Sequence, residues 1–183
     1  ENDVKSYTLS IVEDIEEPNL MFLGTDDGLY LIDLKTVESK QLKLFSEKTI
    51  IGISGAENEN FWITAKFSGY YKISSSGEIQ DEITTNELNG VHGLSAFSDS
   101  PNYLWIGFFD TGLALYDLNT REIIKRITVS DGLPSNRIYT INKDSQGNIW
   151  VSTQQGLAKI DKDSFHVDVL SENDGLQSTE FNL

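Results

Sequence analysis

The chain has 183 residues, of which 38% are hydrophobic and 10% aromatic, and this composition excludes an intrinsically disordered segment. Its 29 acidic residues outnumber the 14 basic ones and give a net charge of −15, so we expect neither nucleic-acid binding nor contact with an anionic membrane surface. Cysteine is absent, which excludes disulfides and thiolate chemistry, and no apolar run of about 18 residues predicts a membrane span or a signal peptide.

Four segments share one pattern: an aromatic or apolar pair, a small residue, a short polar stretch, and a glycine that opens another strand. In chain order the segments begin at Phe22, Trp62, Trp105 and Trp150, and their glycines are Gly28, Gly69, Gly112 and Gly156. The glycines are 41, 43 and 44 residues apart, and Asp-Gly-Leu at 131–133 recurs at 174–176. Repeats of this length, rich in short strands, predict β-propeller blades. The glycines are predicted to ease a tight turn between the second and third strands of each blade.

The predicted fold is all-β, a β-propeller segment of about four four-stranded antiparallel blades. We place the blades at 7–45, 48–84, 91–129 and 137–171, with the first strand of a further blade over 178–183. In the last blade, alternation and turn residues predict strands over 137–142, 149–153, 156–161 and 165–170, with a hairpin turn between the first two carried by Asp144 and Gly147. We expect this segment to be part of a larger propeller whose remaining blades, or a partner chain, cover its open ends.

The aromatic residues and the histidines have predicted structural roles. Trp62, Trp105 and Trp150 occupy equivalent places in the repeat, so we assign them to packing between blades. His166 alternates with the apolar residues of an outer strand and is predicted to be exposed. His92 follows Gly90-Val91 and precedes Gly93, and two interpretations stay open: a satisfied core histidine, which we favour, or a ligand contact at the axial channel.

One face of the predicted propeller is the candidate ligand-binding surface. The innermost strand comes first in each blade, so its entry and the second-to-third turn share a face, where ligands usually bind. The residues there are polar with interleaved aromatics, which suits sugar binding. The predicted ligand-binding residues are Lys66, Asn89, His92, Phe108, Phe109, Asp110, Asn136, Arg137, Gln154 and Gln155. The alternative is that Phe108 or Phe109 packs between blades and that the others are solvated loop residues.

We predict no catalytic residue, no metal site and no cofactor in this segment. Carboxylates recur at turns, as expected in a chain this acidic, and no acid–base pair stands out. The stretch 144–148 lacks the alternating oxygen ligands of a calcium loop, and the two histidines have no metal-site spacing.

The motifs of the C-terminal third resemble the two-component regulator propeller repeat. They are Asp131–Ile138 followed by Ile149–Thr153 and Gly156-Leu157, and a second copy that begins with Asp174-Gly175-Leu176. The resemblance is strongest over 129–183 and weaker toward the N-terminus, where Phe22 replaces tryptophan. It implies a periplasmic sensor region of a bacterial hybrid two-component histidine kinase. Such a region would bind a small molecule such as an oligosaccharide, act within a homodimer, and signal to a kinase located elsewhere in the parent chain.

Two other classes of function stay open. A propeller scaffold that binds proteins is compatible with the acidic surface, although the Trp-Asp and Gly-His signatures of WD repeats are absent. A propeller lyase or glycoside-processing enzyme would need an acid–base pair or metal-bound histidines over the axis, and the sequence nominates neither.

Overall fold

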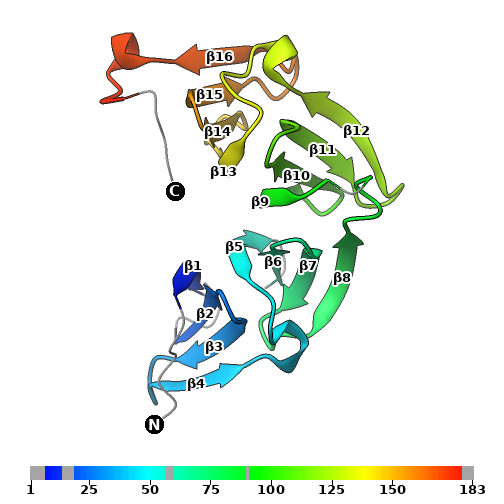
Figure 1. Ribbon diagram of the computed structural model, residues 1–183, viewed down its shortest axis with the longest axis vertical. Helices are drawn as coiled ribbons and strands as arrows, with labels where there is room; N and C mark the ends of the chain where they lie inside the picture. The colour runs from blue at the N-terminus through cyan, green and yellow to red at the C-terminus, as the bar shows by residue number, and fades with distance from the viewer. Residues whose placement is uncertain (1–6, 14–18, 57–59, 90, 179–183) are drawn as a thin grey trace.

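The computed structural model describes residues 7–13, 19–56, 60–89 and 91–178, and these residues form four antiparallel sheets of four strands each. We call the sheets blades 1 to 4 in chain order. Each is a meander in which consecutive strands pair, and the blades fan along an arc with β1, β5, β9 and β13 innermost (Figure 1). The predicted all-β propeller architecture is confirmed.

The strands follow the chain in order. Blade 1 consists of β1 (Thr8–Glu13), β2 (Leu20–Thr25), β3 (Leu29–Asp33) and β4 (Glu38–Gln41). Blade 2 consists of β5 (Ile50–Ala56), β6 (Asn60–Ala65), β7 (Gly69–Ser74) and β8 (Ile79–Thr84). Blade 3 consists of β9 (Gly93–Ser100), β10 (Tyr103–Phe108), β11 (Leu113–Asp117) and β12 (Glu122–Ile127). Blade 4 consists of β13 (Ile138–Lys143), β14 (Ile149–Thr153), β15 (Gly156–Ile160) and β16 (Val167–Leu170). Of the strand predicted over 178–183, all but Ser178 lies outside the described residues.

The recurring Asp-Gly-Leu motif ends a capped turn of 3-10 helix. Short 3-10 helices follow three blades: η1 (Lys43–Phe45), η2 (Val129–Asp131) and η3 (Glu172–Asp174). In η2, Asp131 Oδ2 accepts hydrogen bonds from the Thr128 backbone N–H and hydroxyl, which hold the pKa of this carboxyl below its usual range. Gly132 then takes a left-handed φ of 110°. Ser171, Asp174 and Gly175 repeat this arrangement in η3, so the motif encodes the exit from a blade.

The predicted hairpin turn in blade 4 is built around one carboxylate. Asp144 Oδ1 accepts from the backbone N–H groups of Gln146 and Asn148, and Gly147 takes a φ of 91°. Asp144 Oδ2 accepts from the Trp150 indole N–H at 3.0 Å and from the Asn148 amide. The bond from Trp150, followed by those from Asn148, lowers the pKa of Asp144 far below its usual range. Asp144 is therefore a turn-forming residue.

Two of the repeat glycines avoid a backbone collision. A Cβ on Gly69 would lie 2.3 Å from the carbonyl oxygen of Ile83, and one on Gly112 would lie 2.2 Å from that of Ile127. Both glycines also have positive φ values, of 118° and 82°. These two glycines thus let the outermost strand approach closely, a role that the sequence, which places them at the turn between the second and third strands, did not predict.

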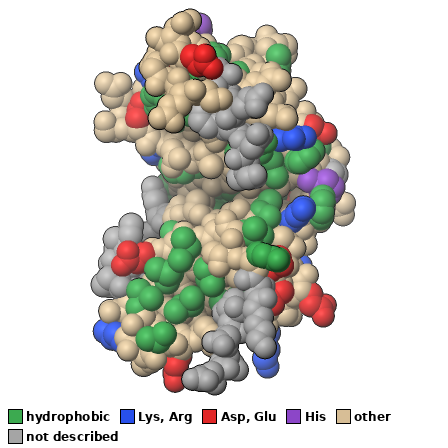
Figure 2. Space-filling model, turned by 60° about the vertical axis from the view of Figure 1, so that its left-hand side comes forward, with side chains coloured by type: hydrophobic (Ala, Val, Ile, Leu, Met, Phe, Trp, Pro, Cys, Tyr) green, Lys and Arg blue, Asp and Glu red, His purple; other side chains and the backbone are tan. Residues whose placement is uncertain are grey.

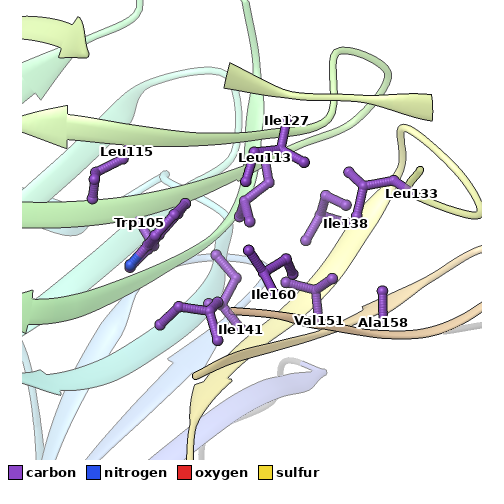
Figure 3. Packing of buried hydrophobic residues seen from close by; sticks show 11 residues of the cluster. Trp105, Leu113, Leu115, Ile127, Leu133, Ile138, Ile141, Val151, Ala158 and Ile160 are labelled. Atoms are coloured by element: carbon purple, nitrogen blue, oxygen red, sulfur yellow. The ribbon is translucent and has the colours of Figure 1, made fainter. Parts of the chain in front are cut away.

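The apolar core lies between the blades as three clusters, one per seam. Trp62 packs in the seam between blades 2 and 3, and Trp105 in the seam between blades 3 and 4 (Figure 3). Trp150 is half-buried and outside the clusters; it alternates along β14 with Val151, which faces blade 3. The predicted packing role is therefore confirmed for Trp62 and Trp105, whereas Trp150, on the equivalent face of blade 4, has no described blade to pack against.

The face of blade 1 that points away from blade 2 is apolar. Ile11 pairs with Leu23 on this face, opposite to Phe22, which packs in the first seam. Ile11 is 56% exposed, and Figure 2 shows hydrophobic side chains gathered over the lower half of the molecule, where blade 1 lies. Among the described residues nothing packs against this face as blade 2 packs against the opposite one.

Candidate functional site

The second-to-third turns of the four blades and the residues that enter the innermost strands lie on one side of the propeller. We call this side the axial face. Backbone hydrogen bonds join the two sets within blades 2, 3 and 4: Lys66 N–H to Thr49 O at 2.8 Å, Phe109 N–H to His92 O at 3.2 Å, and Gln154 N–H to Arg137 O at 3.2 Å. The repeat therefore places Thr49, His92 and Arg137 at equivalent positions in blades 2, 3 and 4, and of these the sequence had indicated His92 and Arg137.

A pocket of about 290 Å³ opens on the axial face of blade 3. It brings together three of the predicted residues, His92, Phe109 and Asp110, because the β10–β11 turn folds back beside the entry to β9. The full lining consists of Val91, His92, Gly93, Leu94, Phe109, Asp110 and Thr111. Its walls combine apolar side chains with one imidazole, one carboxylate and one hydroxyl.

An exposed aromatic ring extends the pocket toward blade 2. Phe67, in the β6–β7 turn, is 64% exposed and has a positive φ of 60°. Its ring meets the His92 ring edge-on, with centroids 4.8 Å apart and planes at 85°. Lys66 Nζ lies 5.2 Å from the centroid of the same ring. Lys66, Phe67 and His92 thus form one polar and aromatic surface across the seam.

His92 is exposed, so the favoured interpretation of a core histidine is wrong. His92 precedes β9 rather than lying within it, and its side chain projects into the pocket on the axial face instead of between two blades. His166, in contrast, is exposed on blade 4 as predicted, with Nε2 3.4 Å from Asp168 Oδ1.

A second stacked pair extends the pocket toward blade 4. The Arg137 guanidinium carbon lies 3.9 Å from the ring centroid of Phe109, and Arg137 Nε–H donates to Phe109 O at 3.2 Å. Phe109 is 47% exposed, so one side of its ring carries the arginine while the remainder faces solvent. Stacking fixes the plane of the guanidinium, and its two terminal amino groups bond to no described residue.

Phe108 is fully buried, and its ring offers no surface to a ligand. It packs in the cluster between blades 2 and 3, because strand alternation turns it inward where Phe109 turns outward. Arg126 lies over this ring at 4.9 Å and donates from one terminal amino group to the carbonyl and hydroxyl oxygens of Thr111, both at 3.2 Å. Burial lowers the pKa of Arg126.

Arg126 is a site residue that sequence reasoning missed. It lies on β12, the outermost strand of blade 3, and reaches the pocket wall at Thr111 through its pairing opposite Ala114 on β11. No local motif marks it, since only the pairing of these strands brings it to the β10–β11 turn.

The other predicted residues lie on the same side but outside the pocket lining. Asn136 is structural: its side-chain Oδ1 accepts from Val129 N–H at 2.9 Å, and its backbone carbonyl accepts from Gly112 N–H at 2.9 Å. Asn89 is exposed, with a φ of 57°. Gln154 and Gln155 are exposed in the β14–β15 turn of blade 4.

The chemistry available at this site is stacking, hydrogen bonding and charge. Within the described ranges, no three His, Asp or Glu side chains lie close enough to hold a metal ion. Asp110 is the single carboxylate in the pocket lining, whereas glycoside hydrolysis generally requires two carboxyl groups flanking the bond. The geometry favours binding over bond cleavage.

The fold and its repeat define part of a β-propeller, and the comparisons with known proteins agree. Residues 132–155 match the model of the family described as two component regulator propeller. The chain therefore contains a repeat of this family, and the resemblance seen in the sequence is confirmed.

The known relatives are longer proteins. The chain is 31% identical to Histidine kinase P4 of Formosa agariphila in an alignment of 77 residues, which covers 38% of this chain and 6% of that protein. It also resembles crystal structures of extracellular domains of two putative hybrid two component systems from B. thetaiotaomicron. The match to BT3049 has a TM-score of 0.81 at 21% identity over 98% of this chain and 25% of that chain. The match to BT4673 has a TM-score of 0.68 at 19% identity over 94% and 23%. The chain thus spans about a quarter of these solved domains.

Both of these solved relatives are extracellular domains. In the part of this chain that the structure describes, no helix is long and apolar enough to cross a membrane.

Proposed function

We propose that this chain is a non-catalytic sensor segment of a hybrid two-component histidine kinase, that it lies in the periplasm, and that it binds an oligosaccharide on its axial face. The matched family repeat and the extracellular two-component domains of the same fold support this assignment. The kinase chemistry belongs to other domains of the parent chain, to which this segment signals within a homodimer.

The pocket on the axial face is the observation that carries the proposal. Phe67 and Phe109 expose aromatic rings on the two sides of His92, from adjacent blades. Planar rings stack on the apolar faces of pyranose units, while charged and hydroxyl groups such as Asp110 and Thr111 bond to sugar hydroxyls. Two rings separated by a polar pocket suit a ligand of more than one sugar unit.

The outer face of blade 1 supports the place of this segment in a longer chain. That face exposes the apolar Ile11 beside its buried strand partner Leu23. In our proposal the remaining blades of the parent chain cover it, as blade 2 covers the opposite face.

A thermal-shift screen tests the proposal. The chain is heated with a panel of plant, host and microbial oligosaccharides, because specific binding at one hundred times the dissociation constant stabilises the fold by about 2.7 kcal/mol. We expect one glycan class to raise the melting temperature, and Phe109→Ala to abolish the shift.

Tyr103→Ala is the matched control. Tyr103 is 37% exposed at the start of β10, on the side of blade 3 opposite to the axial face. Its variant should keep the full shift. A panel that leaves the melting temperature unchanged, or a shift that survives Phe109→Ala and disappears in Tyr103→Ala, would show that the axial face is not a saccharide site.

A further inference from the structure

Basic side chains gather around the pocket of blade 3, although the protein as a whole is acidic. The chain has 29 acidic and 14 basic residues, yet around the pocket of blade 3 lie Lys66, Arg126 and Arg137 beside His92, with Asp110 as the only acid in the pocket lining. Figure 2 shows Lys, Arg and His side chains next to hydrophobic ones along the right-hand edge of the molecule, where Asp and Glu side chains also lie. Three basic side chains thus lie next to a pocket whose lining holds one carboxylate.

Most lysines and arginines of the described residues, these three among them, have no carboxylate partner. Elsewhere Arg121 pairs with Asp81 and Glu87, and Lys143 pairs with Asp99. Among the described residues, Lys66, Arg126 and Arg137 form no ion pair, although the chain is rich in acids. Each lies over a phenylalanine ring instead, at 5.2, 4.9 and 3.9 Å from the centroid. A ring face attracts a cation without neutralising it.

The Arg137 guanidinium is oriented for a further anion. Its Nε–H donates to Phe109 O, and the Phe109 ring covers one side of its plane. The two terminal amino groups on the edge of the plane stay free of bonds to described residues. Two parallel N–H donors of this kind match the spacing of carboxylate or sulfate oxygens and form the stronger, charge-assisted hydrogen bonds.

Arg126, on the outermost strand β12, adds positive charge next to the pocket lining at Thr111. One of its terminal amino groups donates hydrogen bonds to the carbonyl and hydroxyl oxygens of Thr111, which lines the pocket. Burial without a nearby carboxylate lowers the pKa of Arg126, so an anion in the pocket would offset part of its desolvation.

We infer that the saccharide bound at the axial face is anionic, a short oligosaccharide bearing a carboxylate or sulfate group that Arg137 holds while Phe67 and Phe109 stack on sugar rings. This inference rests on the proposed function and adds the charge of the ligand. A long polyanion is disfavoured because the net charge of −15 repels it, whereas a short ligand is attracted by the local cations over a distance comparable to the Debye length.

Isothermal titration with matched probes tests the inference. The acidic probe is a trimer of galacturonic acid and the neutral one is the corresponding galactose trimer, which differs only at the carboxyl group. Sulfated and unsulfated chondroitin disaccharides separate sulfate from carboxylate recognition. We expect an acidic probe to bind, the neutral trimer to bind at least about 10-fold more weakly, and added salt to weaken the acidic probe alone.

Variants of the basic residues locate the effect. Arg137→Gln should weaken the acidic probe about 10- to 100-fold, and Arg137→Lys should restore only part of this because the paired donors are lost. Lys66→Gln should weaken it about 2- to 5-fold. Lys162→Gln removes the same charge from an exposed lysine in the β15–β16 turn on the opposite side and should leave affinity unchanged. Melting temperatures of all four should match the parent chain, which separates binding from folding.

The outcomes distinguish the two proposals. If neutral oligosaccharides bind and acidic ones do not, or if Arg137→Gln binds the acidic probe as the parent does, the inferred charge is overturned and the saccharide sensor stands. If no saccharide of either charge binds the folded chain, both are overturned.

Discussion

The seam between blades 2 and 3 differs between its outer rim and its axial end. At the rim, Arg121 in the β11–β12 turn reaches across to Asp81 at 2.8 Å and to Glu87 at 2.6 Å. At the axial end, His92 meets Phe67 edge-on, and no carboxylate bridges the two blades there among the described residues. The same seam is closed by ion pairs at one end and open to solvent at the other.

This difference separates stability from binding. At the rim Arg121 pairs with Asp81 and Glu87 within the protein, so its removal should affect unfolding and leave ligand affinity alone. At the axial end the aromatic and basic groups lack carboxylate partners, so their removal should affect affinity and leave unfolding nearly unchanged. A fold that uses both arrangements in one seam can change its ligand without changing its blade packing.

The apolar interior that both ends share should give the largest effect. Trp62 is 1% exposed between blades 2 and 3, so Trp62→Ala should lower the free energy of unfolding by about 3–5 kcal/mol. Trp62→Phe should cost much less, because the buried indole N–H has no hydrogen-bond partner to lose among the described residues. Urea denaturation measures both variants. Similar losses for the two would mean that the indole makes a hydrogen bond.

The next largest loss of unfolding free energy is expected from a substitution at the axial end that displaces a buried side chain. A Cβ on Gly93 would lie 1.2 Å from the hydroxyl oxygen of Tyr70, whose side chain is 1% exposed. Gly93→Ala should therefore displace the Tyr70 ring and cost about 1–3 kcal/mol of unfolding free energy. Because Gly93 lines the pocket, saccharide affinity should fall as well, which makes this variant an exception to the separation above.

Gly55→Ala is the matched control for this variant. Gly55 is also on an innermost strand, β5, and a Cβ there meets no atom within 4 Å. Its unfolding free energy should stay within about 0.5 kcal/mol of the parent. An equal loss in the two variants would attribute the effect to strand propensity rather than to Tyr70.

Removing the cation at the rim should have a smaller effect on folding and none on binding. Arg121→Met leaves Asp81 and Glu87 without their partner and should cost about 1–2 kcal/mol, because several hydrogen bonds converge on one guanidinium. Lys143→Met breaks the single pair with Asp99 and should cost about 0.5 kcal/mol. Weaker saccharide binding by Arg121→Met would contradict the separation of the two ends.

The stability lost in Arg121→Met should also depend on pH. Burial raises the pKa of Glu87, but hydrogen bonds from Thr84 and Arg121 outweigh it and hold the pKa below its usual value of 4.5. A lowered carboxyl pKa contributes stability above the unfolded value and loses it as the pH falls through the folded value. The gap between the parent chain and Arg121→Met should therefore be constant at neutral pH and shrink below pH 4.5. A gap that widens on acidification would contradict this assignment.

Much of the fold could be predicted because its signals are local. Asp144 and Gly147 form their turn within a few residues, and alternation defines the strands of blade 4, whose observed ends differ from the predicted ones by at most two residues. Of the candidate site, the choice of face and the grouping of His92, Phe109 and Asp110 also followed from the repeat.

The residues that sequence reasoning misplaced depend on contacts across blades or strands. Strand alternation turns Phe108 and Phe109 in opposite directions, but it is the packing of blade 2 against blade 3 that decides which of the two is buried. Arg126 reaches the pocket through strand pairing with β11.

The repeat, the all-β blades, their turns and the side on which the entry residues gather could all be predicted from local signals, because turn chemistry and period-2 alternation act over a few residues. Which side chains meet depends instead on how the blades pack. Phe67 contacts His92, and Phe109 contacts Arg137, across seams between blades. Whether a cation there finds a carboxylate or a ring depends on how the next blade packs, and that packing is set by the buried apolar surface of both blades.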